Sequence, residues 1–237
     1  MDLQSLVLFD VDGTLMEDSP THKAAFSHAF REVYDVDADI DEIERHGMTD
    51  TSIILGVMKK RGLGEEEVAP KLNQAMNSMT HYFIARLNPS DFRLLPGVAR
   101  LIPALASQGH ILGLVTGNLE PIARARVEAA GIGEYFSVGG FGSDSAVRSE
   151  LVAKAVTQAR QLLVQPFMTF VVGDTPRDVE AGEAAGAHTV AVATGKYSVD
   201  RLRLSGADLV LPSLGEEEWS RLFSYMRVAA ESSRTHA

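Results

Sequence analysis

Short runs of apolar residues recur along the chain, separated by longer amphipathic segments. The runs lie at 6–9, 111–115, 167–172, 188–195 and 207–213. Uninterrupted apolar runs of this length are typical of strands buried on both faces of a parallel sheet. The segments between them have helical periodicity, at 98–109, 121–132, 149–163 and 175–187. Because strands and helices alternate, the pattern predicts an α/β fold whose parallel strands are joined by right-handed crossovers.

One long segment breaks this alternation. From residue 16 to residue 93 the apolar positions follow helical periodicity, and no run resembles a strand. A structureless loop of that length would be unusual in a compact domain, so we expect a separate all-helical domain here. The predicted division is a core of residues 1–15 and 94–237 and an inserted helical domain of residues 16–93.

Composition and charge narrow the classes of ligand. The chain has 237 residues, no cysteine and a formal net charge of −10. Disulfides and thiolate metal sites are therefore excluded, and any metal must be held by oxygen or imidazole. The acidic balance argues against a nucleic-acid or anionic-membrane surface, which needs clustered Lys and Arg. No signal peptide and no apolar run approaching roughly 20 residues is seen, so we expect a cytoplasmic protein, monomeric or homodimeric.

Polar residues stand where three of the predicted strands end. They are Asp10 and Asp12 after the first run, Thr116 and Asn118 after the second, and Asp174 and Asp178 after the third. In open α/β sheets, ligands bind outside the carboxyl ends of the strands. We therefore expect these six side chains to form one pocket.

The acids at these strand ends indicate phosphoryl chemistry beside a metal. Asp10 and Asp174 would repel each other unless a hard divalent cation lay between them, and Mg²⁺ suits carboxylates, waters and a phosphate oxygen. Asp10 could attack phosphorus as a nucleophile, while Asp12 could protonate the leaving oxygen and then activate water. Thr116 and nearby backbone amides could hold the phosphoryl oxygens.

Three motifs together resemble those of the haloacid dehalogenase superfamily. They are "DVDGTL", "VTGN" and "GDTPRD", in this order and around the helical insertion. Members of that superfamily are mostly Mg²⁺-dependent phosphatases with a Rossmann-like core. The insertion resembles the helical cap of the phosphoglycolate-phosphatase-like branch. The resemblance covers almost the whole chain and implies a Rossmann-like parallel sheet with helices on both faces, plus an all-helical cap.

The resemblance also implies roles for individual residues. Asp10 resembles the nucleophile and a metal ligand, and Asp12 resembles the general acid/base that gives the metal its backbone carbonyl. Asp174 resembles the metal ligand of the fourth motif, with Asp178 in support. The second motif, which binds the phosphoryl group, comprises Thr116, Gly117 and Asn118.

The third motif departs from the commonest pattern of the superfamily. Many relatives have a lysine followed by proline there, whereas this chain has "SDSAVRSELVAKAV". Arg148 aligns best by its place before the helix, and an arginine stays charged and binds phosphate bidentately. Lys154 is the alternative, but it lies about a turn and a half into the helix. We therefore favour Arg148.

The cap offers weaker candidates. The stretch "HGMTDTS", 46–52, resembles the glycine-containing loop through which such caps approach the substrate. Thr49 and Asp50 are accordingly candidate specificity residues, with capping of the following helix as the alternative role.

Together these residues favour hydrolysis of a small phosphate monoester, such as phosphoglycolate or a sugar phosphate, through an aspartyl phosphate. A sugar phosphomutase of the same superfamily is the nearest alternative, although the absent Lys-Pro third motif disfavours it. Asp12 argues against a dehalogenase, and nothing marks Lys23 as the Schiff-base lysine of a phosphonate hydrolase. Intact acids at 10, 12 and 174 argue against a non-catalytic phosphate-binding module.

Overall fold

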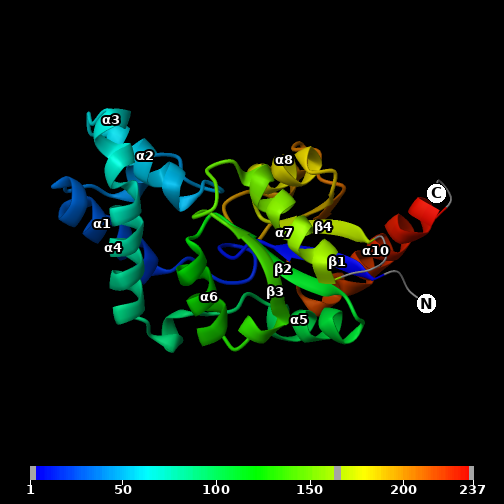
Figure 1. Cartoon of the computed structure of the whole chain (residues 1–237). Coiled ribbons are helices and arrows are strands. Elements are labelled where there is room, and N and C mark those ends of the chain that lie inside the picture. The colour runs from blue at the N-terminus through cyan, green and yellow to red at the C-terminus, as the bar shows by residue number, and fades with distance from the viewer. Residues whose placement is uncertain (1–3, 163–166, 235–237) are drawn as a thin grey trace.

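The core of the molecule is a six-stranded, all-parallel sheet (Figure 1). The computed structural model describes residues 4–162 and 167–234 of the chain. The sheet has the order β3-β2-β1-β4-β5-β6, formed by β1 (Ser5–Phe9), β2 (Ile111–Thr116), β3 (Phe136–Phe141), β4 (Met168–Gly173), β5 (His188–Val192) and β6 (Leu209–Leu211). β1 lies between β2 and β4, so three polar strand ends are adjacent. The predicted parallel α/β sheet is confirmed.

Helices cover both faces of this sheet. They are α5 (Val98–Ser107), α6 (Glu120–Ala129), α7 (Arg148–Leu162), α8 (Pro176–Ala184), α9 (Val199–Arg203) and α10 (Trp219–Arg234). Leu6 and Leu8 of β1 belong to an apolar cluster with the buried face of α7, whereas Val7 and Phe9 belong to the cluster on the other side. In Figure 1, α7 and α8 lie on one side of the sheet and α5 on the other. Within residues 4–162 and 167–234, no helix combines the length and apolar character that crossing a bilayer requires.

The edge strand β3 was not among the predicted strands. Its sequence, FSVGGF, is interrupted by two glycines, which weaken a strand pattern. The structure gives one of them a reason. A Cβ on Gly140 would lie 2.1 Å from the Leu151 carbonyl oxygen, so α7 packs directly against the backbone of β3. Glycine here serves helix–sheet packing.

The segment between β1 and β2 is helical before α5, as its periodicity predicted. It contains α1 (Pro20–Tyr34), α2 (Asp50–Lys60), α3 (Glu65–Val68) and α4 (Leu72–Ala85). α1 packs along α4 through buried aromatic side chains such as Phe26, Phe30 and Phe83. These helices lie to one side of the sheet in Figure 1. The division into two domains at residues 16 and 93 stays a prediction.

Candidate active site

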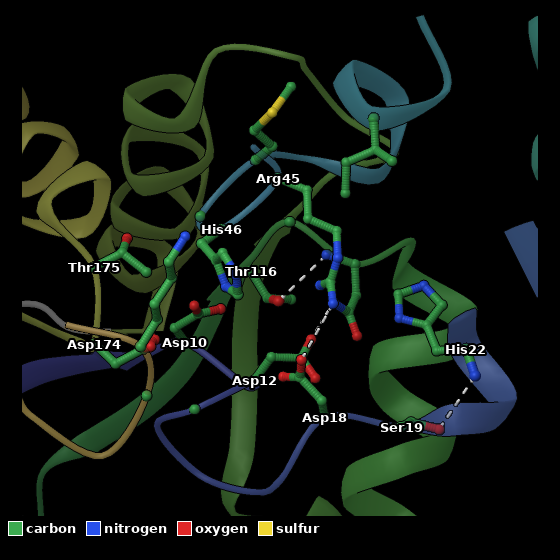
Figure 2. A pocket seen from close by; sticks show the side chains of 18 of the residues that line it. Asp10, Asp12, Asp18, Ser19, His22, Arg45, His46, Thr116, Asp174 and Thr175 are labelled. Atoms are coloured by element: carbon green, nitrogen blue, oxygen red, sulfur yellow. Dashed lines mark hydrogen bonds and ion pairs between the residues drawn. The ribbon is translucent and has the colours of Figure 1, made fainter. Parts of the chain in front are cut away.

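The first strand delivers Asp10 to the centre of the sheet edge. The backbone N–H of Asp10 donates to the carbonyl oxygen of Val172 at 2.9 Å, which continues the ladder between β1 and β4. The Val11 N–H donates to Asp10 Oδ1 at 2.8 Å, so the carboxylate is oriented by its own chain. The residue is 6% exposed. Two neighbouring strands thus fix a buried carboxylate at the bottom of a pocket (Figure 2).

Two further buried carboxylates lie beside it. Asp174 follows β4, and Asp178 lies in the first turn of α8, where Thr175 caps the helix and also donates its hydroxyl to Asp178 Oδ2 at 2.7 Å. One oxygen from each of Asp10, Asp174 and Asp178 can be chosen so that all three lie within 4.8 Å of one another. The first and third predicted strand ends therefore meet as expected.

Burial and mutual repulsion make Asp10 and Asp174 reluctant to ionise. Burial raises the pKa of the Asp10 carboxyl to about 7, with Arg148 opposing the shift and Asp178 adding to it. Burial, together with the charges of Asp178 and Asp10, raises the pKa of Asp174 to about 9. Three carboxylates share this low-dielectric site with one arginine. Its single positive charge is not enough to balance them.

The structure places Arg148, at the first turn of α7, in contact with these acids. Its Nη2 lies 2.9 Å from Asp10 Oδ2 and 2.5 Å from Asp178 Oδ1, and the side chain is buried. Burial works against its charge, but the two carboxylates outweigh it and raise the guanidinium pKa. Lys154 instead pairs with Asp144 at 2.6 Å, with 39% of its side chain exposed. Arg148 is therefore the third-motif candidate at the site.

Asp12 turns its carboxylate away from this cluster, toward Asn118 and an arginine that sequence reasoning missed. Asn118 Nδ2 donates to Asp12 Oδ2 at 2.7 Å, and Arg126 Nη2 lies 2.7 Å from Asp12 Oδ1. Burial raises the pKa of the Asp12 carboxyl, but the charge and hydrogen bond of Arg126 outweigh burial and lower the pKa to about 2. One signal in the sequence pointed to Arg126, because it shares the apolar face of α6 with Ile122 and Val127.

Thr116 and Gly117, from the second motif, lie at the end of β2. Thr116 is fully buried, and its Oγ1 accepts from the Asn118 N–H at 3.3 Å. A Cβ on Gly117 would lie 2.2 Å from the Met48 carbonyl oxygen, so the loop that leads into α2 touches the core at this residue. The phosphate-binding role of this motif stays a prediction, although its residues line the same pocket as Asp10.

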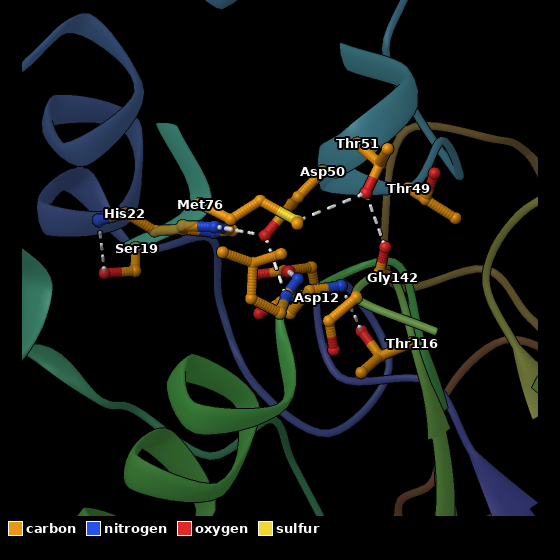
Figure 3. A network of polar contacts seen from close by, with 12 residues as sticks. Asp12, Ser19, His22, Thr49, Asp50, Thr51, Met76, Thr116 and Gly142 are labelled. Carbon is orange, nitrogen blue, oxygen red and sulfur yellow. Dashed lines mark hydrogen bonds and ion pairs between the residues drawn. The ribbon is translucent and has the colours of Figure 1, made fainter. Parts of the chain in front are cut away.

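The two cap candidates have different positions. Thr49 caps α2, accepting from the Ser52 N–H at 3.2 Å, and is absent from the lining of the main pocket. Asp50 does line that pocket, where its Oδ2 lies 3.0 Å from His22 Nε2 and accepts from the Leu119 N–H at 2.9 Å. Figure 3 shows the contact between Asp50 and His22, together with the Thr51 hydroxyl that donates to the Gly142 carbonyl. Asp50 thus joins helical segment and core, and its specificity role stays a prediction.

The pocket over these strand ends has a volume of about 560 Å³. Its floor comes from the sheet, and its far wall comes from the helical segment, including His22, Phe26 and Ile53. Figure 2 shows Asp10, Asp12 and Thr116 pointing toward this space. Lys23 lines it too, but its ammonium group pairs with Asp39 at 3.1 Å and with Asp41. Lys23 is therefore engaged in ion pairs at the pocket mouth.

The donor set fits a hard divalent cation. Asp10, Asp174 and Asp178 offer oxygen ligands alone, which is what Mg²⁺ prefers. Space beside Asp174 is kept open by glycine: a Cβ on Gly13 would lie 2.5 Å from Asp174 Oδ2, and one on Gly195 would lie 1.8 Å from it. Gly13 also has a φ of +71°, which favours glycine. These residues could therefore bind a metal at the strand ends.

Comparison with known proteins places the chain in a family. The profile of the haloacid dehalogenase-like hydrolases matches residues 7–192, so the chain belongs to this family of hydrolases. It is 24% identical over 225 residues to the phosphoglycolate phosphatase of Escherichia coli O157:H7, covering 89% of each chain. It is 27% identical over 210 residues to the enzyme of the same name from Pectobacterium atrosepticum, covering 86% of each.

A solved structure supports the same fold. The crystal structure of CbbY from Rhodobacter sphaeroides in complex with phosphate superposes with a TM-score of 0.69 at 23% identity. The match covers 90% of this chain and 96% of that one. At this identity the likeness concerns the fold, and the family assignment rests on the sequence match.

Proposed function

We propose that this chain is a Mg²⁺-dependent phosphatase that hydrolyses a small phosphate monoester through an aspartyl-phosphate intermediate. The observation that carries the proposal is the meeting of Asp10, Asp174 and Asp178 with the guanidinium of Arg148 at one buried strand edge. Membership of the haloacid dehalogenase-like hydrolases and the names of the two bacterial relatives support it.

In the first step the carboxylate of Asp10 attacks phosphorus. A bond forms between a carboxylate oxygen and phosphorus, and the bond from phosphorus to the ester oxygen breaks. Arg148, which already donates to Asp10, and the hydroxyl of Thr116 would donate hydrogen bonds to the phosphoryl oxygens. Fixed donors in a buried site stabilise the charge that accumulates there during transfer.

Asp12 handles the protons of both steps. It protonates the leaving oxygen as the ester bond breaks. It then takes a proton from the water that attacks phosphorus, while the bond from phosphorus to the Asp10 oxygen breaks and phosphate is released. Bound at Asp10 and Asp174, with Asp178 in support, Mg²⁺ would neutralise the acids and polarise a phosphoryl oxygen. The helical wall with His22, Phe26 and Ile53 shields the reacting atoms from bulk water.

The substrate is a small anionic ester. A cavity of about 560 Å³ holds a molecule the size of phosphoglycolate or of a sugar phosphate. Both bacterial relatives are named for phosphoglycolate, which supports that class of ester first. Positive residues of the pocket, such as Arg148 and Arg45, suit a substrate that carries negative charge.

The test is phosphate release from a panel of small phosphomonoesters, with and without Mg²⁺. Wild-type protein, Asp10→Asn and a surface control, Asp200→Asn, are compared. An amide is a poor nucleophile, so Asp10→Asn should reduce release to background while the control matches wild type. Asp200 suits the control because its side chain is 88% exposed.

Other outcomes separate the alternatives. Phosphoryl transfer back to a sugar phosphate, without net release, would favour a phosphomutase. Full activity in Asp10→Asn would refute the aspartyl-phosphate mechanism. Binding of phosphate without any turnover would leave a non-catalytic phosphate-binding module.

A further inference from the structure

Arg126 forms a closed triad with Asp12 and Asn118. Its Nη2 lies 2.7 Å from Asp12 Oδ1, its Nη1 donates to Asn118 Oδ1 at 2.7 Å, and Asn118 in turn donates to Asp12 Oδ2 at 2.7 Å. Both oxygens of the Asp12 carboxylate therefore have a side-chain donor. The carboxylate is fixed in two directions, although it stands on a loop after β1.

Stability alone is a poor explanation for this arginine. Arg126 is 0% exposed, and its Nε has no hydrogen-bond partner among the residues that the structure describes. Burying a guanidinium is expensive, and an apolar side chain of similar volume is often neutral or stabilising at such a site. Its neighbours on the same face of α6, Ile122, Ala123 and Val127, are all buried and apolar. The buried charge of Arg126 among these apolar side chains is better explained by its contact with Asp12, which faces the pocket.

Arg126 also contacts the start of the helical segment. Its Nη2 donates to the Glu17 carbonyl oxygen at 3.0 Å, and the Glu17 N–H donates to the Arg93 carbonyl at 3.1 Å. Glu17 precedes α1, and Arg93 precedes α5, so these two backbone segments join helical segment and core. The Arg126 guanidinium therefore binds both the Asp12 carboxylate and the backbone of Glu17, which leads into the helices that form the pocket's far wall.

We propose that Arg126 is a positioning residue for the proton transfers of this enzyme. This inference rests on the proposed function. With Asn118 it aims the carboxyl of Asp12 at the leaving oxygen. Arg126 favours the ionised form of Asp12 in the free site. Each carboxylate oxygen has about two acceptor positions, so Asp12 can take up the proton that it passes on while both bonds are kept. When the ester bond breaks, that proton moves to the leaving oxygen, and the guanidinium stabilises the carboxylate that remains.

A leaving-group comparison separates positioning from a structural role. Departure of an alkoxide needs a proton, whereas acetate and 4-nitrophenolate are weak bases that leave without one. If Arg126 aims the proton donor, its loss should hurt alkyl esters selectively. A general decline in folding or substrate binding should hurt both classes equally.

The experiment uses the full chain with Mg²⁺ and measures kcat/KM, which reports on the steps up to ester cleavage. The alkyl ester is whichever of phosphoglycolate and ethyl phosphate is hydrolysed faster, and the activated substrate is whichever of acetyl phosphate and 4-nitrophenyl phosphate is hydrolysed faster. The variants are Arg126→Met and Arg126→Lys. Val127→Ala is the matched control, since it removes buried volume at the next position of α6.

We expect Arg126→Met to lose at least about tenfold more kcat/KM on the alkyl ester than on the activated one, since general acid catalysis contributes about 10²–10⁴-fold. Arg126→Lys keeps a charge but loses the planar fork of donors. It should therefore also lose more kcat/KM on the alkyl ester than on the activated one, but by a smaller factor than Arg126→Met. If Arg126→Met does not fold, the comparison of the two substrates in Arg126→Lys tests the positioning role. Val127→Ala should affect both substrates equally.

Equal losses on the two classes in Arg126→Met, or in Arg126→Lys where only that variant folds, would overturn the positioning role. That result is distinct from failure of the proposed function, in which wild-type protein and Asp10→Asn would release phosphate equally or not at all.

Discussion

Replacing Arg148 by methionine should weaken the fold and the reaction together. Arg148 is buried and pairs with Asp10 at 2.9 Å and Asp178 at 2.5 Å, while its guanidinium also donates to the Gly47 and Val115 carbonyls at 3.3 and 3.4 Å. Removing one partner of a buried ion pair leaves uncompensated charge and costs about 3–5 kcal/mol. We expect a decrease of that size in the free energy of unfolding of the metal-free protein at pH 7.

The matched control is Lys154→Met. Lys154 lies on the same helix as Arg148 and pairs with Asp144 at 2.6 Å, but its side chain is 39% exposed. An exposed pair of this kind contributes about 0–1 kcal/mol. Urea unfolding of both variants, with and without Mg²⁺, measures the two costs. Mg²⁺ should restore part of the stability of Arg148→Met, because the cation shields the same acids.

Activity gives a second reading of the same pair of variants. Loss of one fixed donor to a developing charge costs on the order of 10²–10³-fold in turnover. We expect that loss in Arg148→Met and less than about twofold in Lys154→Met. If Lys154→Met were the more damaging variant in either measurement, the third-motif assignment to Arg148 would be wrong.

Two further predictions concern charge and close contact. Because the pKa values of Asp10 and Asp174 are raised to about 7 and about 9, the metal-free folded state binds more protons than the unfolded chain between about pH 4 and pH 9. Its free energy of unfolding should fall as pH rises through that window, and saturating Mg²⁺ should remove the fall. Thermal melts at several pH values measure this dependence with and without Mg²⁺, and equal slopes under the two conditions would contradict the prediction. Gly142→Ala places a Cβ 1.9 Å from the Gly117 carbonyl oxygen. The displaced second motif should cost on the order of 100-fold in kcat/KM, whereas Gly64→Ala, whose Cβ has ordinary contacts, should match wild type.

The sheet and its polar strand ends could be predicted because both follow from local pattern. Apolar runs ending at Asp10, Thr116 and Asp174 required only the rule that parallel strands present their carboxyl ends at one edge. β3 was not predicted because two of its six residues are glycines, which weaken the strand pattern. The need for Gly140 arises from the close approach of α7. A contact between distant elements leaves no periodic signal.

The orientation of individual side chains depended on the same kind of distant contact. Asp12 meets Arg126 and Asn118 from segments more than 100 residues away, and no spacing rule foretells that triad. Asp50 sits in the predicted cap loop, yet its carboxylate engages His22 and the Leu119 N–H. The types of residue were foreseeable from the motifs, whereas their partners required the fold.

The aspartyl-phosphate intermediate is tested by capturing the phosphoenzyme. Wild-type protein and Asp10→Asn are mixed with Mg²⁺ and the best ester of the panel, denatured in acid and reduced with borohydride, which converts an acyl phosphate to an alcohol. Peptide mass spectrometry then locates any homoserine. We expect homoserine at position 10 in the wild-type protein and none in the variant. Homoserine at another aspartate, or phosphate release without any trapped residue, would contradict it.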